Sequence, residues 1–177
     1  DHFLGLKLFE GSKIIGSQYY KESIEIFVDE SDPSIYFPDI KIDKKYKLKF
    51  GRHEIEMIEN PGHSKCTIIT QINKKYTHAG DEIIFTNDGR PVLPFVGLKY
   101  NKRHVESLNK LLSIKNRVVF PGHGSILIDE NEVDNDIKNR IGYLNNVNTS
   151  NGNINYKDAV SRDYEFMNTK WHEYNCK

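Results

Sequence analysis

Apolar and polar residues alternate in the middle of the chain, and this period of two predicts β-strands. Residues 45–50 and 53–59 both alternate and are separated by a two-residue turn, which predicts a β-hairpin. Residues 66–72 and 74–80 form a second pair of strand-like stretches around a turn. We therefore expect an antiparallel sheet in this part of the chain.

Other stretches have helical spacing instead. Residues 3–10 are predicted to form a short helix, whereas the signals over residues 18–34 conflict and support neither helix nor strand. Three later helices are predicted: one that begins at Asn101 as its N-cap, one after Asp129, and one over residues 155–174. Their apolar positions are Val105, Leu108, Leu111 and Leu112; Val133, Ile137, Ile141 and Leu144; and Val160, Tyr164, Met167 and Trp171.

Composition narrows the class of protein. The 177 residues suffice for one domain with a buried core, and the 25 basic side chains balance the 25 acidic ones. A neutral chain exerts no general attraction on nucleic acid or on an anionic membrane. The two cysteines form no redox or metal-binding motif, which favours reduced thiols. We therefore expect a cytoplasmic protein with no nucleic-acid or membrane partner.

The tripeptide Pro-Gly-His occurs twice, at residues 61–63 and 121–123, each time after an apolar stretch. Pro fixes one backbone angle and Gly permits a strained one, so each turn is expected to present its imidazole at the edge of a sheet. Gly80-Asp81 ends another predicted strand, and Asp1-His2 opens the chain. If these strands are neighbours, imidazoles and carboxylates meet at one rim, which suits zinc, iron or manganese better than calcium or magnesium.

Each of these features is weak by itself, because a single Pro-Gly-His or Gly-Asp is a common turn. Their order along the chain makes the combination much stronger. The stretches DHFLG, IENPGHSKCTIIT, YTHAGDEIIF and VVFPGHGS resemble the successive motifs of the metallo-β-lactamase superfamily. The resemblance implies an α/β fold, the four-layer αββα sandwich, over residues 1–150, with a C-terminal helical tail over residues 151–177.

By this resemblance, five residues are expected to bind two divalent metal ions, zinc in the first place, with iron or manganese as alternatives. His63 would bind the first ion, Asp81 would bridge the two, and Asp1, His2 and His123 would bind the second. Asp1 is also the expected catalytic residue, because it would orient the attacking water. The family's two leading His residues precede Asp1, so we expect the chain to lack them and the opening strands of the fold.

The resemblance implies a hydrolase that directs a metal-bridged hydroxide at an ester, thioester, lactone or phosphoester bond of a small-molecule substrate. An aspartate at position 81 resembles the branch of hydroxyacylglutathione hydrolase, whereas the β-lactamases of subclass B1 carry Cys there. The alternative is an iron-dependent oxidoreductase of the same fold, either a persulfide dioxygenase or a diiron oxygen reductase. A non-catalytic binding module is a third reading, which the retained Asp81 and both Pro-Gly-His turns disfavour.

The remaining polar residues have ordinary interpretations. His104 and His172 are predicted to lie at the surface, and Cys66 to be a small buried strand residue. His78 is either a structural residue or a group that supports the metal ligands. The loop over residues 86–100 contains Val92, Leu93, Phe95 and Val96, which would either form an apolar wall beside Asp81 or anchor the loop on the core.

Overall fold

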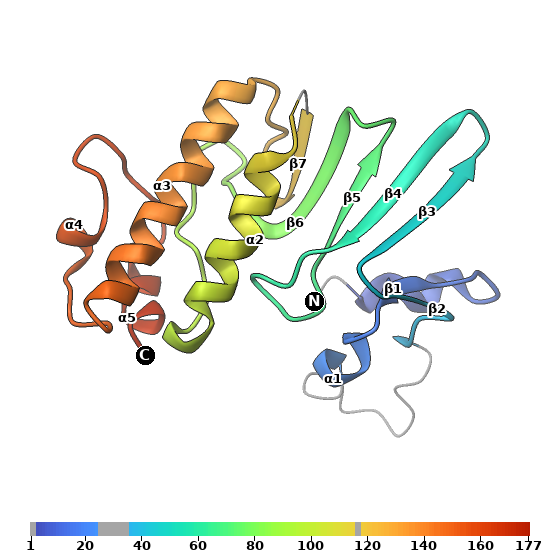
Figure 1. Ribbon diagram of the computed structural model, residues 1–177, viewed down its shortest axis with the longest axis horizontal. Coiled ribbons are helices and arrows are strands. Elements are labelled where there is room, and N and C mark those ends of the chain that lie inside the picture. The colour runs from blue at the N-terminus through green and yellow to red at the C-terminus, as the bar shows by residue number, and fades with distance from the viewer. Residues whose placement is uncertain (1–2, 25–35, 116–117) are drawn as a thin grey trace.

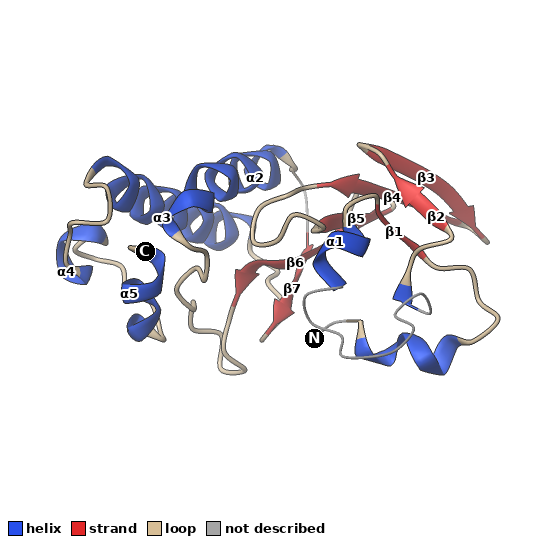
Figure 2. Cartoon of the chain, turned by 90° about the horizontal axis from the view of Figure 1, so that it is seen from below, coloured by secondary structure: helices blue, strands red, loops and turns tan. Residues whose placement is uncertain are grey.

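The structure, a computed structural model, describes residues 3–24, 36–115 and 118–177 (Figure 1). It is a mixed α/β fold in which the larger helices lie at one end of the molecule, while the strands and two short N-terminal helices lie towards the other. Figure 2 shows α2 to α5 gathered at one end and the hairpin of β3 and β4 at the other. The elements are η1 (Leu4–Phe9), β1 (Ile15–Ser17), α1 (Tyr20–Ile24), β2 (Ile40–Ile42), β3 (Lys45–Phe50), β4 (His53–Glu59), β5 (Ile68–Ile72), β6 (Tyr76–Ile84), η3 (Leu98–Tyr100), α2 (Asn101–Ser113), β7 (Val118–His123), α3 (Glu130–Thr149), α4 (Tyr156–Ala159), η4 (Thr169–Trp171) and α5 (His172–Asn175).

Strands β3 to β7 form a five-stranded sheet in sequence order. The predicted hairpin is confirmed, since β3 and β4 pair antiparallel with Lys45 opposite Ile58 and Phe50 opposite His53. Strands β5 and β6 also pair antiparallel, as predicted. Strand β7 joins β6 in parallel after the chain has crossed through α2. The parallel pair matters for the site, because β6 and β7 carry Asp81 and His123.

The hydrophobic core lies between one face of β5–β7 and the pair α2 and α3, which pack side by side. The predicted helical spacing explains this packing, because Leu108, Leu111, Val133, Ile137 and Leu144 are all buried. Asp129 caps α3, since its side chain accepts hydrogen bonds from the backbone N–H groups of residues 131 and 132. The two helices therefore cover the same part of the sheet that carries the candidate site.

A buried arginine connects α3 to the chain that follows β6. Arg140 pairs with Asp136 one turn earlier, with Nε and Oδ2 2.6 Å apart. Its other nitrogens donate to the carbonyl oxygens of Val92 at 2.6 Å and Ile84 at 2.9 Å. Since breaking a buried pair leaves an uncompensated charge, this network fixes the position of residues 84 and 92 relative to the helix.

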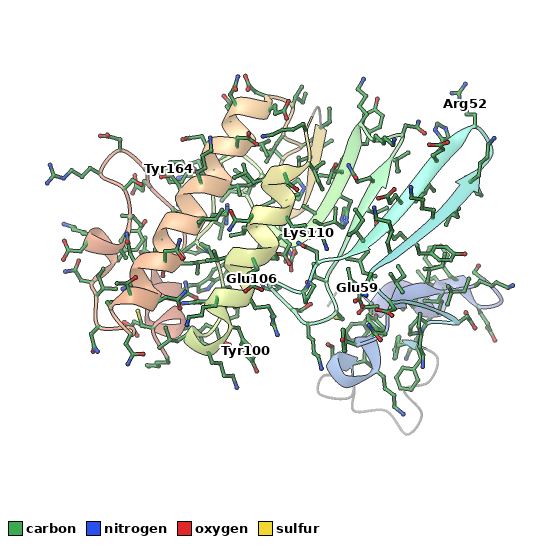
Figure 3. All side chains as sticks on the ribbon, in the orientation of Figure 1. Arg52, Glu59, Tyr100, Glu106, Lys110 and Tyr164 are labelled. Carbon is green, nitrogen blue, oxygen red and sulfur yellow. The ribbon has the colours of Figure 1, made fainter. Side chains whose placement is uncertain are left out.

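The small parallel sheet of β1 and β2 is attached to the main sheet through Glu59. The carboxylate of Glu59 is buried and accepts a hydrogen bond from Ser17 Oγ at 2.8 Å. The backbone oxygen of the same residue accepts from Nζ of Lys110, which reaches it from α2. Figure 3 shows Glu59 at the end of β4 and Lys110 on α2. One residue thus joins β1, β4 and α2.

The prediction of a helix over residues 155–174 is wrong. The structure has only the short helices α4 and α5 and the 3-10 helix η4 there. The backbone N–H of Met167 donates to Pro91 at 2.8 Å, and its carbonyl accepts from Leu93 at 3.0 Å. These backbone groups pair with a distant loop, so they are not available to a helix. The prediction that Asn101 is an N-cap is also wrong, because that side chain is buried and donates to the carbonyl of Asn175.

Within the described residues, no helix is both long enough and apolar enough to cross a membrane.

Candidate metal centre

Three of the five predicted metal ligands lie together beside the parallel strands. His63 follows β4, Asp81 lies within β6, and His123 ends β7. Nε2 of His63 is 3.9 Å from Oδ2 of Asp81, and Nε2 of His123 is 3.6 Å from Oδ1. Each oxygen of one carboxylate therefore faces a different imidazole, although the two histidines lie far apart in the sequence. The prediction of a turn at residues 121–123 is wrong, because these residues form the end of β7.

The spacing of these atoms fits a metal site better than a direct hydrogen bond. Hydrogen bonds between N–H and oxygen span about 2.7–3.2 Å. Two donors of one tetrahedral zinc ion, each about 2.0–2.1 Å from the metal, lie about 3.4 Å apart. The distances of 3.6 and 3.9 Å are closer to the second value. Imidazole nitrogen with a shared carboxylate is also a donor set that zinc and iron accept.

The other two predicted ligands, Asp1 and His2, lie outside the described residues. In the ranges 3–24, 36–115 and 118–177, no group of three or more His, Cys, Asp or Glu side chains is arranged to hold one ion. His63 with Asp81 and His123 with Asp81 are pairs, so each position would need further donors to complete a metal shell. The ligand set thus stays a prediction.

A bulge in β6 positions Asp81. The sequence predicted that this strand ends at Gly80. Instead it continues to Ile84, with register shifts against β7 on both sides of Gly80. Gly80 has a φ of +57°, which only glycine adopts without a steric cost. Such a bulge locally re-aims the side chain beside it. The left-handed backbone of Gly80 therefore helps to direct the side chain of Asp81.

The glycines of the two Pro-Gly-His segments have a different purpose from the one expected. Gly62 and Gly122 do not have positive φ angles, so the predicted strained dihedral is wrong for both. Instead they supply space. A Cβ at Gly122 would collide with Oδ1 of Asp81, and a Cβ at Gly62 would collide with Glu82 and Ser107. Each segment can approach its partner only because it lacks a side chain there.

Glu82 holds the first Pro-Gly-His turn from the interior. This side chain is 1% exposed, and its Oε1 accepts a hydrogen bond from the backbone N–H of His63 at 3.1 Å. On the other side of the turn, Arg103 of α2 donates to the carbonyl oxygen of Gly62 at 3.2 Å. Groups from β6 and α2 thus fix the backbone that carries His63.

The proton on this buried cluster can be assigned from its hydrogen bonds. Burial raises the pKa of Glu82 to about 8, against hydrogen bonds from Ser107 and His63 that lower it. Ser107 Oγ donates to the carbonyl of His104 at 2.8 Å and also contacts Oε2 of Glu82. A hydroxyl has one proton, so Ser107 can donate either to His104 or to the carboxylate form of Glu82. When Glu82 is a carboxylic acid, the form that a pKa of about 8 favours at neutral pH, it can donate to Ser107 and both contacts are satisfied.

His104 completes the buried cluster as a neutral imidazole. Its Nε2 lies 3.2 Å from the carbonyl oxygen of Glu82, and since a carbonyl only accepts, Nε2 carries the proton. Burial, and after it the charge of His63, lower the pKa of His104 to about 3. The ring meets that of His63 edge-on, with centroids 6.4 Å apart. A neutral His104 thus lies behind His63 and brings no positive charge to it.

A cavity of about 420 Å³ opens beside the three converging side chains. It is lined by His63, Asp81, Ile84, Phe85, Thr86, Val92, Phe95, His123, Asn168 and Trp171. Of the four apolar loop residues named in the sequence, only Val92 and Phe95 line this cavity, because Leu93 and Val96 belong to the hydrophobic core. Val92 and Phe95 thus form an apolar wall of the cavity, as one interpretation of the loop expected, and Leu93 and Val96 anchor the loop on the core, as the other expected.

Several side chains lie elsewhere than predicted. His104 is 1% exposed rather than at the surface. It precedes Leu108 by four residues, so helical spacing could have placed it on the buried stripe. His172 is also buried, between the hydroxyl of Tyr143 and the carbonyl of Ile154. Cys66 lies half-buried in the turn before β5, not in a strand. His78 is exposed, and nothing in the printed sequence singled out Glu82.

Comparison with known proteins identifies the fold. No protein-family profile matches the chain. A beta-lactamase-like protein 2 homolog of Drosophila melanogaster is 25% identical over 135 residues, which cover 72% of this chain and 42% of that protein. This chain therefore spans less than half the length of that relative.

Two solved structures are similar in fold. A metallo-beta-lactamase family protein of Thermus thermophilus superposes with a TM-score of 0.57 and 16% identity, over 83% of this chain and 57% of the other. A mutant form of a flavo di-iron protein of Thermotoga maritima superposes with a TM-score of 0.52 and 18% identity, over 80% and 39%. The resemblance of the motifs to the metallo-β-lactamase superfamily is thereby confirmed in the fold, and the chain is a protein with the metallo-β-lactamase fold.

Proposed function

We propose that the protein is a metal-dependent hydrolase of an ester, thioester, lactone or phosphoester bond. One observation carries the proposal: a single carboxylate, that of Asp81, lies between the imidazoles of His63 and His123 with one oxygen toward each. The residues proposed to bind two divalent metal ions, zinc in the first place, are Asp1, His2, His63, Asp81 and His123.

When bound, a pair of divalent ions lowers the pKa of a shared water to about 7 and so supplies hydroxide at neutral pH. Asp81 would keep the two cation positions at a fixed separation, because the bulge at Gly80 and the close approach of Gly122 hold its carboxylate in place. His63 would keep its orientation through the hydrogen bond from its backbone to Glu82. Asp1 is proposed to orient the attacking water.

The fold supports an enzymatic role, because proteins with the metallo-β-lactamase fold are typically enzymes. The cavity beside His63, Asp81 and His123 supports it further. Its volume of about 420 Å³ lies within the range of about 300–1,000 Å³ that small-molecule sites occupy. A small substrate could therefore reach the atoms between the imidazoles.

The test combines metal content with turnover. The purified protein is analysed for bound metals and assayed against a thioester, a lactone, a carboxylate ester and a phosphoester. We expect about two zinc ions per chain and hydrolysis of at least one substrate. Asp81→Ala should lose the paired metals and slow turnover by about a thousandfold or more, since it removes the shared ligand. Asp134→Ala, which removes a carboxylate of α3 that pairs with Lys115, is the matched control.

The same experiment separates the main alternative, an iron-dependent oxidoreductase. The fold is shared with a flavo di-iron protein, so bound iron with oxygen consumption and without hydrolysis would replace the hydrolase proposal. Full turnover by Asp81→Ala would remove the basis of both readings, because each needs the carboxylate at position 81.

A further inference from the structure

Two aromatic side chains form one wall of the cavity beside the candidate metal centre. Phe95 comes from the loop after β6, and Trp171 comes from the C-terminal segment. Their ring centroids are 4.9 Å apart. On the other side, Phe95 stacks on Tyr174 with centroids 4.4 Å apart and an interplanar angle of 20°. We call Phe95 and Trp171 the aromatic wall.

The aromatic wall remains accessible to solvent. Phe95 is 37% exposed, Tyr174 beside it is 48% exposed, and Trp171 is half-buried. Large aromatic side chains gain free energy when they are buried, so a stack left open toward a cavity is a surface on which a ligand can gain that energy. The stack lines the same cavity as Asp81 and His123, so a substrate bound at the candidate metal centre would contact it.

Asn175 holds the two segments of the aromatic wall together. Its side chain is fully buried, and Oδ1 accepts from the backbone N–H of Val96 at 3.1 Å. Its Nδ2 donates to the carbonyl of Pro94 at 2.7 Å and to the hydroxyl of Tyr143 at 2.9 Å. These bonds join α5 to the residues on either side of Phe95. The aromatic wall is therefore fixed before any ligand binds, which lowers the cost of binding.

The side chains that line the cavity narrow the class of ligand that it can bind. Among the described residues that line this cavity there is no Lys or Arg. Recognition of a phosphate or a peptide carboxylate normally relies on such side chains. Away from His63, Asp81 and His123, the lining consists of Ile84, Phe85, Thr86, Val92, Phe95, Asn168 and Trp171. Five of these seven are apolar, so this part of the lining can bury an apolar group of a ligand.

We propose that the aromatic wall binds a flat, uncharged aromatic group of the substrate, so that the enzyme prefers aryl-bearing esters or thioesters. This inference rests on the proposed hydrolase function and names its substrate class. The ring would lie against Trp171 and Phe95, with the bond to be cleaved toward Asp81 and His123.

Binding is tested separately from catalysis. Trp171 is the single tryptophan of the chain, so its fluorescence reports directly on the aromatic wall. The probe is N-methylbenzamide, which is flat, neutral and resistant to hydrolysis, and N-methylacetamide is its aliphatic match. We expect saturable quenching by the first probe only, weakened about tenfold in affinity by Phe95→Ala. Phe50→Ala, which removes an aromatic ring 71% exposed on the distant hairpin, should bind the probe like the unchanged protein.

Turnover provides the second measurement. We expect Trp171→Leu to lower the ratio of kcat/KM for a phenylacetyl ester to kcat/KM for the matching acetyl ester about tenfold, because only the first ester carries the ring that Trp171 would contact. Equal losses of kcat/KM on both esters, or no quenching by N-methylbenzamide, would contradict the proposal that the aromatic wall binds an aromatic group. Quenching by N-methylbenzamide without hydrolysis of any carboxylate ester, thioester, lactone or phosphoester would instead retain the aromatic binding site and overturn the hydrolase function, so the two failures are distinct.

Discussion

The two Pro-Gly-His segments have the same sequence but different surroundings. The first lies outside any strand, its His63 side chain is 23% exposed, and its backbone is held by Glu82 and Arg103. The second is the end of β7, its His123 side chain is 49% exposed, and its glycine packs directly on Asp81. Both histidines nevertheless reach the same carboxylate.

The difference shows two ways to position an imidazole. At the first turn, a buried cluster of β6 and α2 side chains fixes the backbone, so the precision of His63 depends on interior hydrogen bonds. At the second, the parallel pairing of β6 and β7 and the lack of a side chain at Gly122 fix it. Damage to the cluster should therefore affect His63 alone, whereas damage at Gly122 should affect Asp81 and both metal positions.

The largest effect on the free energy of unfolding is expected at Glu82, which holds the backbone of His63 but not that of His123. Glu82→Ala should lower the free energy of unfolding by about 3 kcal/mol, because it leaves a cavity and an unpaired N–H at His63. Glu82→Gln should stay within about 1 kcal/mol of the unchanged protein, since an amide can accept from His63 and donate to Ser107. Urea unfolding measures both. A Gln variant as unstable as the Ala variant would contradict the assignment of a protonated Glu82.

The second prediction compares the two glycines directly. Gly62→Ala and Gly122→Ala should each cost about 2 kcal/mol in the free energy of unfolding, because both overpack a filled position. They should differ in metal content: Gly122→Ala displaces Asp81 and should lose both ions, whereas Gly62→Ala should mainly weaken the ion at His63. Gly142→Ala on α3, where a new Cβ meets nothing within 4 Å, is the control. Equal metal loss in the two variants would remove the distinction between the segments.

The smallest effect is a pH dependence of the free energy of unfolding that comes from His104, the α2 residue behind His63. The pKa of His104 is about 3 in the folded protein, below its ordinary value of 6.5. Its contribution to stability is therefore complete above pH 6.5 and is lost as the pH falls toward 3. Between pH 6.5 and 5.5, the unchanged protein should lose about 1 kcal/mol more than His104→Gln, measured by urea unfolding at equal metal content. Parallel profiles for the two proteins would mean that His104 is protonated in the fold.

Local pattern was sufficient for the regular elements. Alternation predicted the hairpin of β3 and β4, and helical spacing predicted α2 and α3, because burying one face of a strand or helix requires that period. The same rule failed over residues 155–174, where an apparently helical stripe pairs its backbone with the loop at Pro91 and Leu93. A partner so distant in sequence leaves no trace in local spacing.

The sequence by itself determined the motifs and, through them, the expectation that His63, Asp81 and His123 belong to one site. Tertiary structure decided how they meet: the bulge at Gly80 turns Asp81, and Gly122 leaves room for its carboxylate. Glu82 and the aromatic wall also depend on contacts between segments far apart in the chain. Such contacts follow from packing in three dimensions, where a residue's role is set by its neighbours rather than by its own type.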